Sequence, residues 1–272
     1  MKSHSRRLRN CFRRLQKSNE AALIPFLMAG DPDLATTEEM ALAMVDEGAD
    51  ILELGVPFSD PMADGPVLQR AAERSLARGT NLTAVLDLVA RLRAKTEIPI
   101  VLFGYANPFL QFGAEALASA LAAAGGDAIL CVDAPVDEAD QLRIPLADNG
   151  LDMIFLLAPT STKDRIRRVL KSASGFVYFV SVAGVTGDKQ VQADPIAALV
   201  GQIRAETKLP IGVGFGISTP QEAASVAAIS DAVIVGSKFS TLIEAAEDST
   251  QAVGAVAALC GDLKKATRRA ST

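Results

Sequence analysis

Eight short apolar runs recur along this chain, and each is followed by a longer segment with helical periodicity. The runs are rich in valine, isoleucine, leucine and phenylalanine, and they begin near Ala22, Asp50, Ile98, Asp127, Asp152, Phe176, Pro210 and Asp231. The segments between them, such as residues 36–48 and 114–125, are alanine-rich and commonly end near a glycine, as helix C-termini do. Alternating strands and helices predict parallel strands joined by crossovers, and eight such units favour a closed barrel over an open sheet. The predicted fold class is α/β, a single (β/α)8 TIM barrel with an extra N-terminal helix.

The chain carries no sign of a second domain. Its 272 residues, 49% of them hydrophobic, suffice to fill one barrel, and no Gly/Pro/Ser-rich linker or charge block divides them. We therefore expect one domain over residues 1–272, with an N-terminal helix at about 5–17 and a C-terminal helical tail at about 248–269. The long spacing between the second and third strands leaves room for an additional helix at about 82–95.

The basic N-terminus allows two interpretations. Residues 1–17 contain five arginines and no acidic residue, as a targeting peptide would. However, Leu8, Cys11, Phe12 and Leu15 follow the spacing of one apolar helical stripe, which favours a helix that docks on the domain.

Charge and cysteine content narrow the class of protein. A net charge of −5 gives no general attraction to nucleic acid or to an anionic membrane, so the expected partners are small molecules or another protein. No stretch approaches the roughly 18 uninterrupted apolar residues of a membrane span. Three widely spaced cysteines suit reduced thiols. We expect a cytoplasmic protein.

Glycine pairs follow the last two predicted strands, where a barrel builds its active site. Gly214 and Gly216 follow the seventh strand, and Gly236-Ser237 follows the eighth, each just before a helical pattern. Glycine lets backbone N–H groups approach an anion, and the next helix N-terminus adds partial positive charge, so a phosphate site is expected there. Ordinary turns are the alternative. The glycine-rich loop at 181–187 is either a mobile lid or a structureless connection.

Glu53 is an ionisable residue near the end of an otherwise apolar strand. Period-two alternation places Leu52 and Leu54 on one face and Glu53 with Ile51 on the other, which for a functional residue is the barrel interior. Burial would raise the pKa of this carboxyl group and suit it to acid–base work near neutral pH. A glutamate neutralised by a structural partner is the alternative.

Two aspartates follow in the loop after the second strand. Prolines and a glycine surround Asp64 and could hold its carboxylate over the barrel mouth. Either Asp60 or Asp64 could instead be a turn or cap residue. The single histidine, His4, lies in the N-terminal tail, which makes a histidine-ligated zinc site implausible, and no metal is expected. Lys238 is better placed for phosphate contact or solvent exposure than for a Schiff base.

Several segments resemble the signature motifs of tryptophan synthase alpha subunits. They are residues 25–32 (PFLMAGDP), 53–66 (ELGVPFSDPMADGP), 105–108 (YANP), 133–135 (DAP), 183–187 (AGVTG), 214–218 (GFGIS) and 236–237 (GS). The resemblance runs from about Arg9 to Glu244, and the block around Glu53 is its most specific part. Because that family opens with a comparable helix, the resemblance also argues against a transit peptide.

The resemblance implies a lyase that splits indole-3-glycerol phosphate into indole and glyceraldehyde 3-phosphate in tryptophan biosynthesis. It implies that Glu53 is the catalytic acid–base, that Asp64 stabilises charge at the indole N–H, and that Tyr178 supports the site. The implied substrate contacts are Phe26, Tyr105, Thr186, Gly187, Phe215, Gly216, Gly236 and Ser237.

A partner is implied as well. Asp60, Asn107 and Pro108 resemble positions that face the tryptophan synthase beta subunit in an alpha-beta-beta-alpha heterotetramer. Pyridoxal phosphate is expected on that subunit and no cofactor on this chain. Met28, Val182 and Lys238 depart from the family pattern.

The sequence alone leaves two rival functions open. Another phosphate-binding barrel, an isomerase or synthase, would share the glycine loops but not the block from Glu53 to Asp64. A catalytically silent regulatory subunit would bind ligand only to regulate its partner, and intact Glu53, Asp64 and Tyr178 disfavour it.

Overall fold

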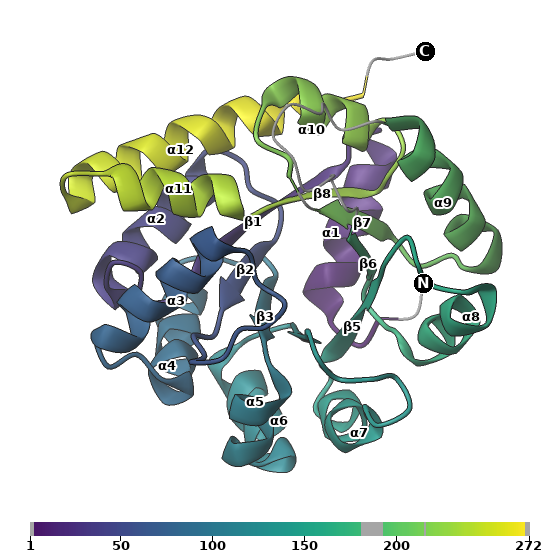
Figure 1. The fold of residues 1–272 in the computed structure, drawn as a ribbon, viewed down its shortest axis with the longest axis horizontal. Helices are drawn as coiled ribbons and strands as arrows, with labels where there is room; N and C mark the ends of the chain where they lie inside the picture. Colours follow the sequence, from purple (N-terminus) through teal and green to yellow (C-terminus); the bar gives the residue numbers. More distant parts are fainter. Residues whose placement is uncertain (1–2, 181–192, 215, 270–272) are drawn as a thin grey trace.

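Eight parallel strands close into a barrel in the order β1 to β8, as the sequence predicts (Figure 1). The computed structural model describes residues 3–180, 193–214 and 216–269. The strands are β1 (Ala22–Met28), β2 (Leu52–Gly55), β3 (Ile100–Gly104), β4 (Ala128–Cys131), β5 (Asp152–Leu157), β6 (Val177–Val180), β7 (Ile211–Gly214) and β8 (Ala232–Val235). Strand β1 pairs with β8 as well as with β2, which closes the barrel.

Helices surround the barrel, and an additional helix stands between β2 and β3 where the sequence predicts one. They are α1 (Arg6–Lys17), α2 (Leu34–Asp46), α3 (Pro66–Ala77), α4 (Leu82–Arg93), α5 (Ala106–Phe112), α6 (Ala114–Ala124), α7 (Asp140–Asp148), α8 (Lys163–Ser172), α9 (Ala193–Glu206), α10 (Pro220–Ala227), α11 (Ser237–Ala245) and α12 (Ser249–Ala266). Among the described residues, none of these helices is long and apolar enough to cross a membrane.

The strands divide their side chains between two apolar layers. Leu52 and Leu54 point outward and pack under the helices, whereas Ile51 packs inside the barrel. Helix α1 closes one end of this interior, because its apolar stripe belongs to the same cluster as Ile51. The predicted docking helix is therefore confirmed.

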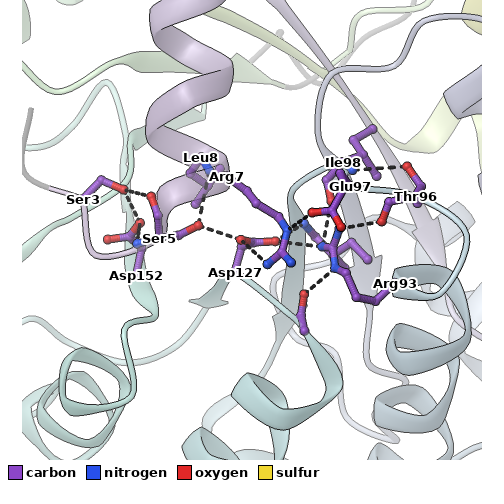
Figure 2. A network of polar contacts seen from close by, with 12 residues as sticks. Ser3, Ser5, Arg7, Leu8, Arg93, Thr96, Glu97, Ile98, Asp127 and Asp152 are labelled. Carbon is purple, nitrogen blue, oxygen red and sulfur yellow. Dashed lines mark hydrogen bonds and ion pairs between the residues drawn. The ribbon is translucent and has the colours of Figure 1, made fainter.

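Buried aspartates fix the N-terminus of α1 at that end (Figure 2). Ser5 caps the helix by accepting from the N–H of Leu8 (3.2 Å), and the Ser5 hydroxyl donates to Asp127 (2.6 Å). The backbone N–H of His4 donates to Asp152 (2.7 Å). These contacts explain why the helix seats on the strands despite its many arginines.

Three of the aspartates that precede strands share one structural role. Each accepts a hydrogen bond from the backbone N–H of a residue in the preceding strand. The pairs are Asp50 with Leu23, Asp127 with Ile100 and Asp231 with Ile211, at 3.0, 3.0 and 2.9 Å. These carboxylates therefore serve the fold at the N-terminal ends of the strands, which leaves the opposite end for chemistry.

Candidate active site

A cavity of about 430 Å³ opens at the C-terminal ends of the strands. Side chains from the barrel interior form its floor, and the segments that follow β2, β7 and β8 form its walls. Its described lining consists of Phe26, Glu53, Ala63, Asp64, Gly65, Leu68, Phe103, Val132, Leu156, Tyr178, Val180, Gly216, Ile217, Ser218, Ile234, Gly236, Ser237, Lys238 and Thr241. The volume and the mostly apolar floor suit a small aromatic ligand that carries a polar group.

Glu53 lies on the floor of this cavity, on the interior face that alternation predicts. Its side chain is 1% exposed, and Oε1 has no hydrogen-bond partner among the described residues. Burial without a charged partner raises the pKa of this carboxyl group to about 8. A structural ion pair would lower the pKa instead, so the described surroundings favour the functional interpretation of Glu53.

Tyr178 reaches the same floor from β6. Burial raises the pKa of its hydroxyl group well above the usual value, and the nearby carboxylates of Glu53 and Asp64 raise it further. The tyrosine stays neutral and can therefore act only as a hydrogen-bonding or packing group. A Cβ at Gly214 would overlap the Tyr178 hydroxyl, so glycine is needed on β7 at this point.

Asp64 belongs to the loop between β2 and α3, and its side chain is half-buried at the cavity wall. Burial raises the pKa of its carboxyl group to about 6, and a hydrogen bond with Tyr105 opposes that rise. Asp64 is thus the more acidic of the two cavity carboxyl groups. At pH 7 Asp64 is mostly ionised while Glu53 is mostly protonated, and such a difference is typical of acid–base sites.

Tyr105 lies behind the Asp64 loop. Its hydroxyl oxygen accepts a hydrogen bond from the N–H of Ala63 (3.1 Å), and its ring packs against Phe58 with centroids 5.4 Å apart. The side chain is 4% exposed and is not part of the described cavity lining. The structure therefore places Tyr105 as a support for the loop, whereas the sequence analysis expected it to line the pocket.

Aromatic side chains form an apolar wall of the cavity. Phe26 on β1 meets Phe103 on β3 edge to face, with ring centroids 5.3 Å apart. Leu68 packs in the same apolar cluster and also lines the cavity. The sequence analysis identified Phe26 but missed Phe103, which the period-two alternation of β3 could have placed beside the interior residue Val101.

The glycine turns after β7 and β8 also border the cavity, and a Cβ at Gly236 would lie 3.5 Å from the Cβ of Phe26, so the turn after β8 is next to the aromatic wall. Gly216 has a φ of +74°, a conformation that glycine adopts readily, and both Gly216 and Gly236 line the cavity. Helix α11 begins at Ser237 directly after Gly236 and has no side-chain cap. The three predicted phosphate contacts Gly216, Gly236 and Ser237 are thus brought together. Thr186, Gly187 and Phe215, like the predicted lid at 181–187, lie outside the described residues.

The three residues expected to face a partner lie on neighbouring surface segments. Asp60 and Asn107 are exposed and Pro108 is half-buried, in the β2–α3 loop and at the start of α5. Two apolar side chains that the sequence analysis did not single out, Met62 and Leu110, are 92% and 44% exposed on the same two segments.

Comparison with known proteins supports one family. Residues 12–268 match the family model described as "Tryptophan synthase alpha chain". The tryptophan synthase alpha chain of Citrifermentans bemidjiense is 50% identical over 265 residues, covering 96% of this chain and 99% of that protein. The one from Cupriavidus pinatubonensis is 47% identical over 261 residues, with 96% and 98% coverage. The crystal structure of tryptophan synthase subunit alpha from Legionella pneumophila strain Paris superposes with a TM-score of 0.90 at 38% identity, covering 98% of both chains.

Proposed function

This chain belongs to the tryptophan synthase alpha chain family, and on that premise we propose that Glu53 and Asp64 perform its reaction, the cleavage of indole-3-glycerol phosphate to indole and glyceraldehyde 3-phosphate. The observation that carries the proposal is the buried carboxyl group of Glu53. It lines a cavity of suitable size and has an Oε1 without a described partner. The reaction is that of a carbon–carbon lyase.

Glu53 begins the reaction as an acid. With a pKa of about 8 it holds its proton at pH 7 and can donate it to C3 of the indole ring. Protonation at C3 converts the ring into an indolenine cation, which can accept an electron pair. The Glu53 carboxylate then takes the proton of the hydroxyl group next to the ring. The carbon–carbon bond breaks, its electrons return to the ring, and an aldehyde forms, so that Glu53 regains its proton.

Asp64 stabilises the cation formed in the first step. Its carboxylate, with a pKa of about 6, is ionised at pH 7 and accepts the hydrogen bond of the indole N–H, where positive charge develops. Tyr178, which shares the cavity floor with Glu53, supports the acid–base residue and helps to exclude water.

The cavity offers residues to contact both the ring and the phosphate of the substrate. The indole ring packs against Phe26, and the phosphate accepts hydrogen bonds near Gly216, Gly236 and Ser237. Tyr105 acts indirectly, by holding the loop that carries Asp64. Thr186, Gly187 and Phe215 remain proposed contacts on the basis of family resemblance.

Indole release by the purified chain tests this assignment. Glu53→Gln keeps the size of the side chain but cannot transfer the proton, so kcat should fall by about 10²–10⁴-fold. Glu38→Gln, on the outer helix α2, is a matched control and should retain wild-type kcat. A Glu53→Gln variant within threefold of wild type would exclude Glu53 as the acid–base.

We also propose that the beta subunit docks over Asp60, Asn107 and Pro108 in an alpha-beta-beta-alpha heterotetramer in the cytoplasm. Exposed Met62 and Leu110 on the same segments support an interface there. Pyridoxal phosphate would belong to that partner, and this chain would need no cofactor of its own. Mixing the two subunits and measuring the mass of the complex tests the stoichiometry.

A further inference from the structure

The charges around the cavity are unevenly distributed. Its described lining contains two carboxyl groups, Glu53 and Asp64, and one basic side chain, that of Lys238. The proposed substrate carries a phosphate ester, which is close to a dianion at pH 7. An anion of this charge needs compensation in a site that already holds acidic groups.

Two helices begin beside the cavity, and their first turns differ. At α10, the carboxylate of Glu222 accepts hydrogen bonds from the N–H groups of Ser218 (2.8 Å) and Thr219 (3.0 Å). That helix start therefore already holds an anionic group of its own. Helix α11 follows Gly236 without a side-chain cap, so its first turn is the better position for an external anion.

Lys238 is the second residue of α11, and its helix face is defined by its neighbours. Ser237 and Thr241 line the cavity together with Lys238, whereas Phe239 and Ser240 are buried on the other side of the helix. Lys238 is itself half-buried. Its stem is thus held at the cavity wall on the side where the phosphate is expected.

Acidic residues nearby do not neutralise this lysine. Glu244 lies on the same helix, but its carboxylate pairs with Arg70 (2.6 Å) and Arg74 (3.0 Å). Glu222 is bound to the first turn of α10. Within the described residues, Lys238 forms no ion pair, so its positive charge remains available to a ligand.

We propose that Lys238 supplies the positive charge that binds the substrate phosphate and makes the cavity selective for a phosphate ester dianion. This inference rests on the proposed function for the identity of the substrate. An ammonium group at a helix N-terminus adds a full charge to the partial charge of the backbone donors.

Binding of glycerol 3-phosphate tests this role without any cleavage step. Calorimetric titration should show Kd about 10–100-fold higher for Lys238→Met than for wild type, the usual range for a lost charged hydrogen bond. Lys238→Arg keeps the charge and should stay within about threefold. Lys208→Met is the matched control at the opposite end of the barrel and should not change Kd, since Lys208 is exposed just before β7.

Two further readouts separate a charge effect from a disturbed fold. With indole-3-glycerol phosphate, Lys238→Met should raise KM and leave kcat within about threefold, because the phosphate contact is the same in the ground and transition states. The ratio of Kd between Lys238→Met and wild type should also shrink from pH 8 to pH 5, since phosphate esters lose one charge near pH 6.

A Kd change below threefold in Lys238→Met would overturn the proposal, and so would an equal loss in Lys238→Arg or a ratio that does not vary with pH. Failure of the proposed function has a different signature. If glycerol 3-phosphate binding depends on Lys238 but wild type releases no indole, the proposed cleavage reaction is wrong and the phosphate contact of Lys238 is supported. If wild type releases indole but binding is indifferent to Lys238, only the lysine assignment falls.

Discussion

Replacing Glu53 by glutamine should stabilise the fold increasingly as the pH rises. Glu53 is 1% exposed, and burial raises its pKa from 4.5 to about 8. Between these values the folded chain keeps a proton that the unfolded chain releases, so the wild-type free energy of unfolding falls with pH by about 1.4 kcal/mol per pH unit. The loss begins near pH 4.5 and is complete above pH 8. Glutamine cannot ionise, so Glu53→Gln escapes this loss.

The expected magnitude follows from the width of this pH window. From pH 5 to pH 8 the ionisation of Glu53 lowers the free energy of unfolding of the wild type by about 4 kcal/mol. The free energy of unfolding of Glu53→Gln should therefore rise by about that much relative to wild type. Other titrating groups cancel in the comparison of the two proteins. The change of this difference with pH is the measured quantity, because the glutamine amide adds a contribution of its own that is constant with pH.

Urea unfolding followed by far-ultraviolet circular dichroism at pH 5, 7 and 8.5 measures this difference, with the total free energy taken over all transitions. Glu38→Gln is the control, because the pKa of Glu38 is lowered in the folded chain whereas that of Glu53 is raised. Hydrogen bonds from Lys95 and then Arg91 lower the pKa of Glu38, so its contribution is already complete above pH 4.5 and the control difference should stay flat from pH 5 to 8.5. A flat difference for Glu53→Gln as well would show that its carboxyl group is not held protonated by burial.

Three other variants test the surroundings of the site. Gly214→Ala places a Cβ against the Tyr178 hydroxyl and should lower kcat. It should also lower the free energy of unfolding, measured by urea titration, by about 1–3 kcal/mol. Gly254→Ala on α12, where a Cβ meets open space, is the control. Tyr105→Phe removes the acceptor for the Ala63 N–H and one hydrogen-bond partner of Asp64, so kcat/KM should fall about tenfold. Loss of that partner should also raise the pKa of Asp64 and move the acidic limb of the pH profile of kcat/KM to higher pH. An acidic limb that does not move would contradict the link to Asp64. Asp60→Ala should leave basal indole release nearly unchanged but weaken stimulation by the beta subunit, and equal stimulation of both proteins in a titration would remove Asp60 from the coupling.

Local patterns in the sequence were sufficient for the fold and for the main acid–base candidate. The alternation of apolar runs and helical segments predicted the closed barrel, because each strand must be buried on both faces and each helix on one. The alternation of side chains along a strand predicted that Glu53 and Ile51 face the barrel interior, and the structure confirms this orientation. The apolar stripe of residues 8–15 likewise predicted that the basic first helix docks on the barrel.

Other properties of the site depend on residues that meet only when the barrel closes. Tyr105 supports the Asp64 loop because the segments after β2 and β3 become neighbours, and no local pattern shows which side of that loop a tyrosine will occupy. The pKa values of Glu53 and Asp64 follow from desolvation, which depends on everything packed around each carboxyl group. The place of Lys238 at the cavity wall was also decided by the tertiary structure, because the docking of α11 determines which of its faces meets the ligand. Sequence periodicity thus determined which faces are buried, and the closed barrel determined which polar groups share one cavity.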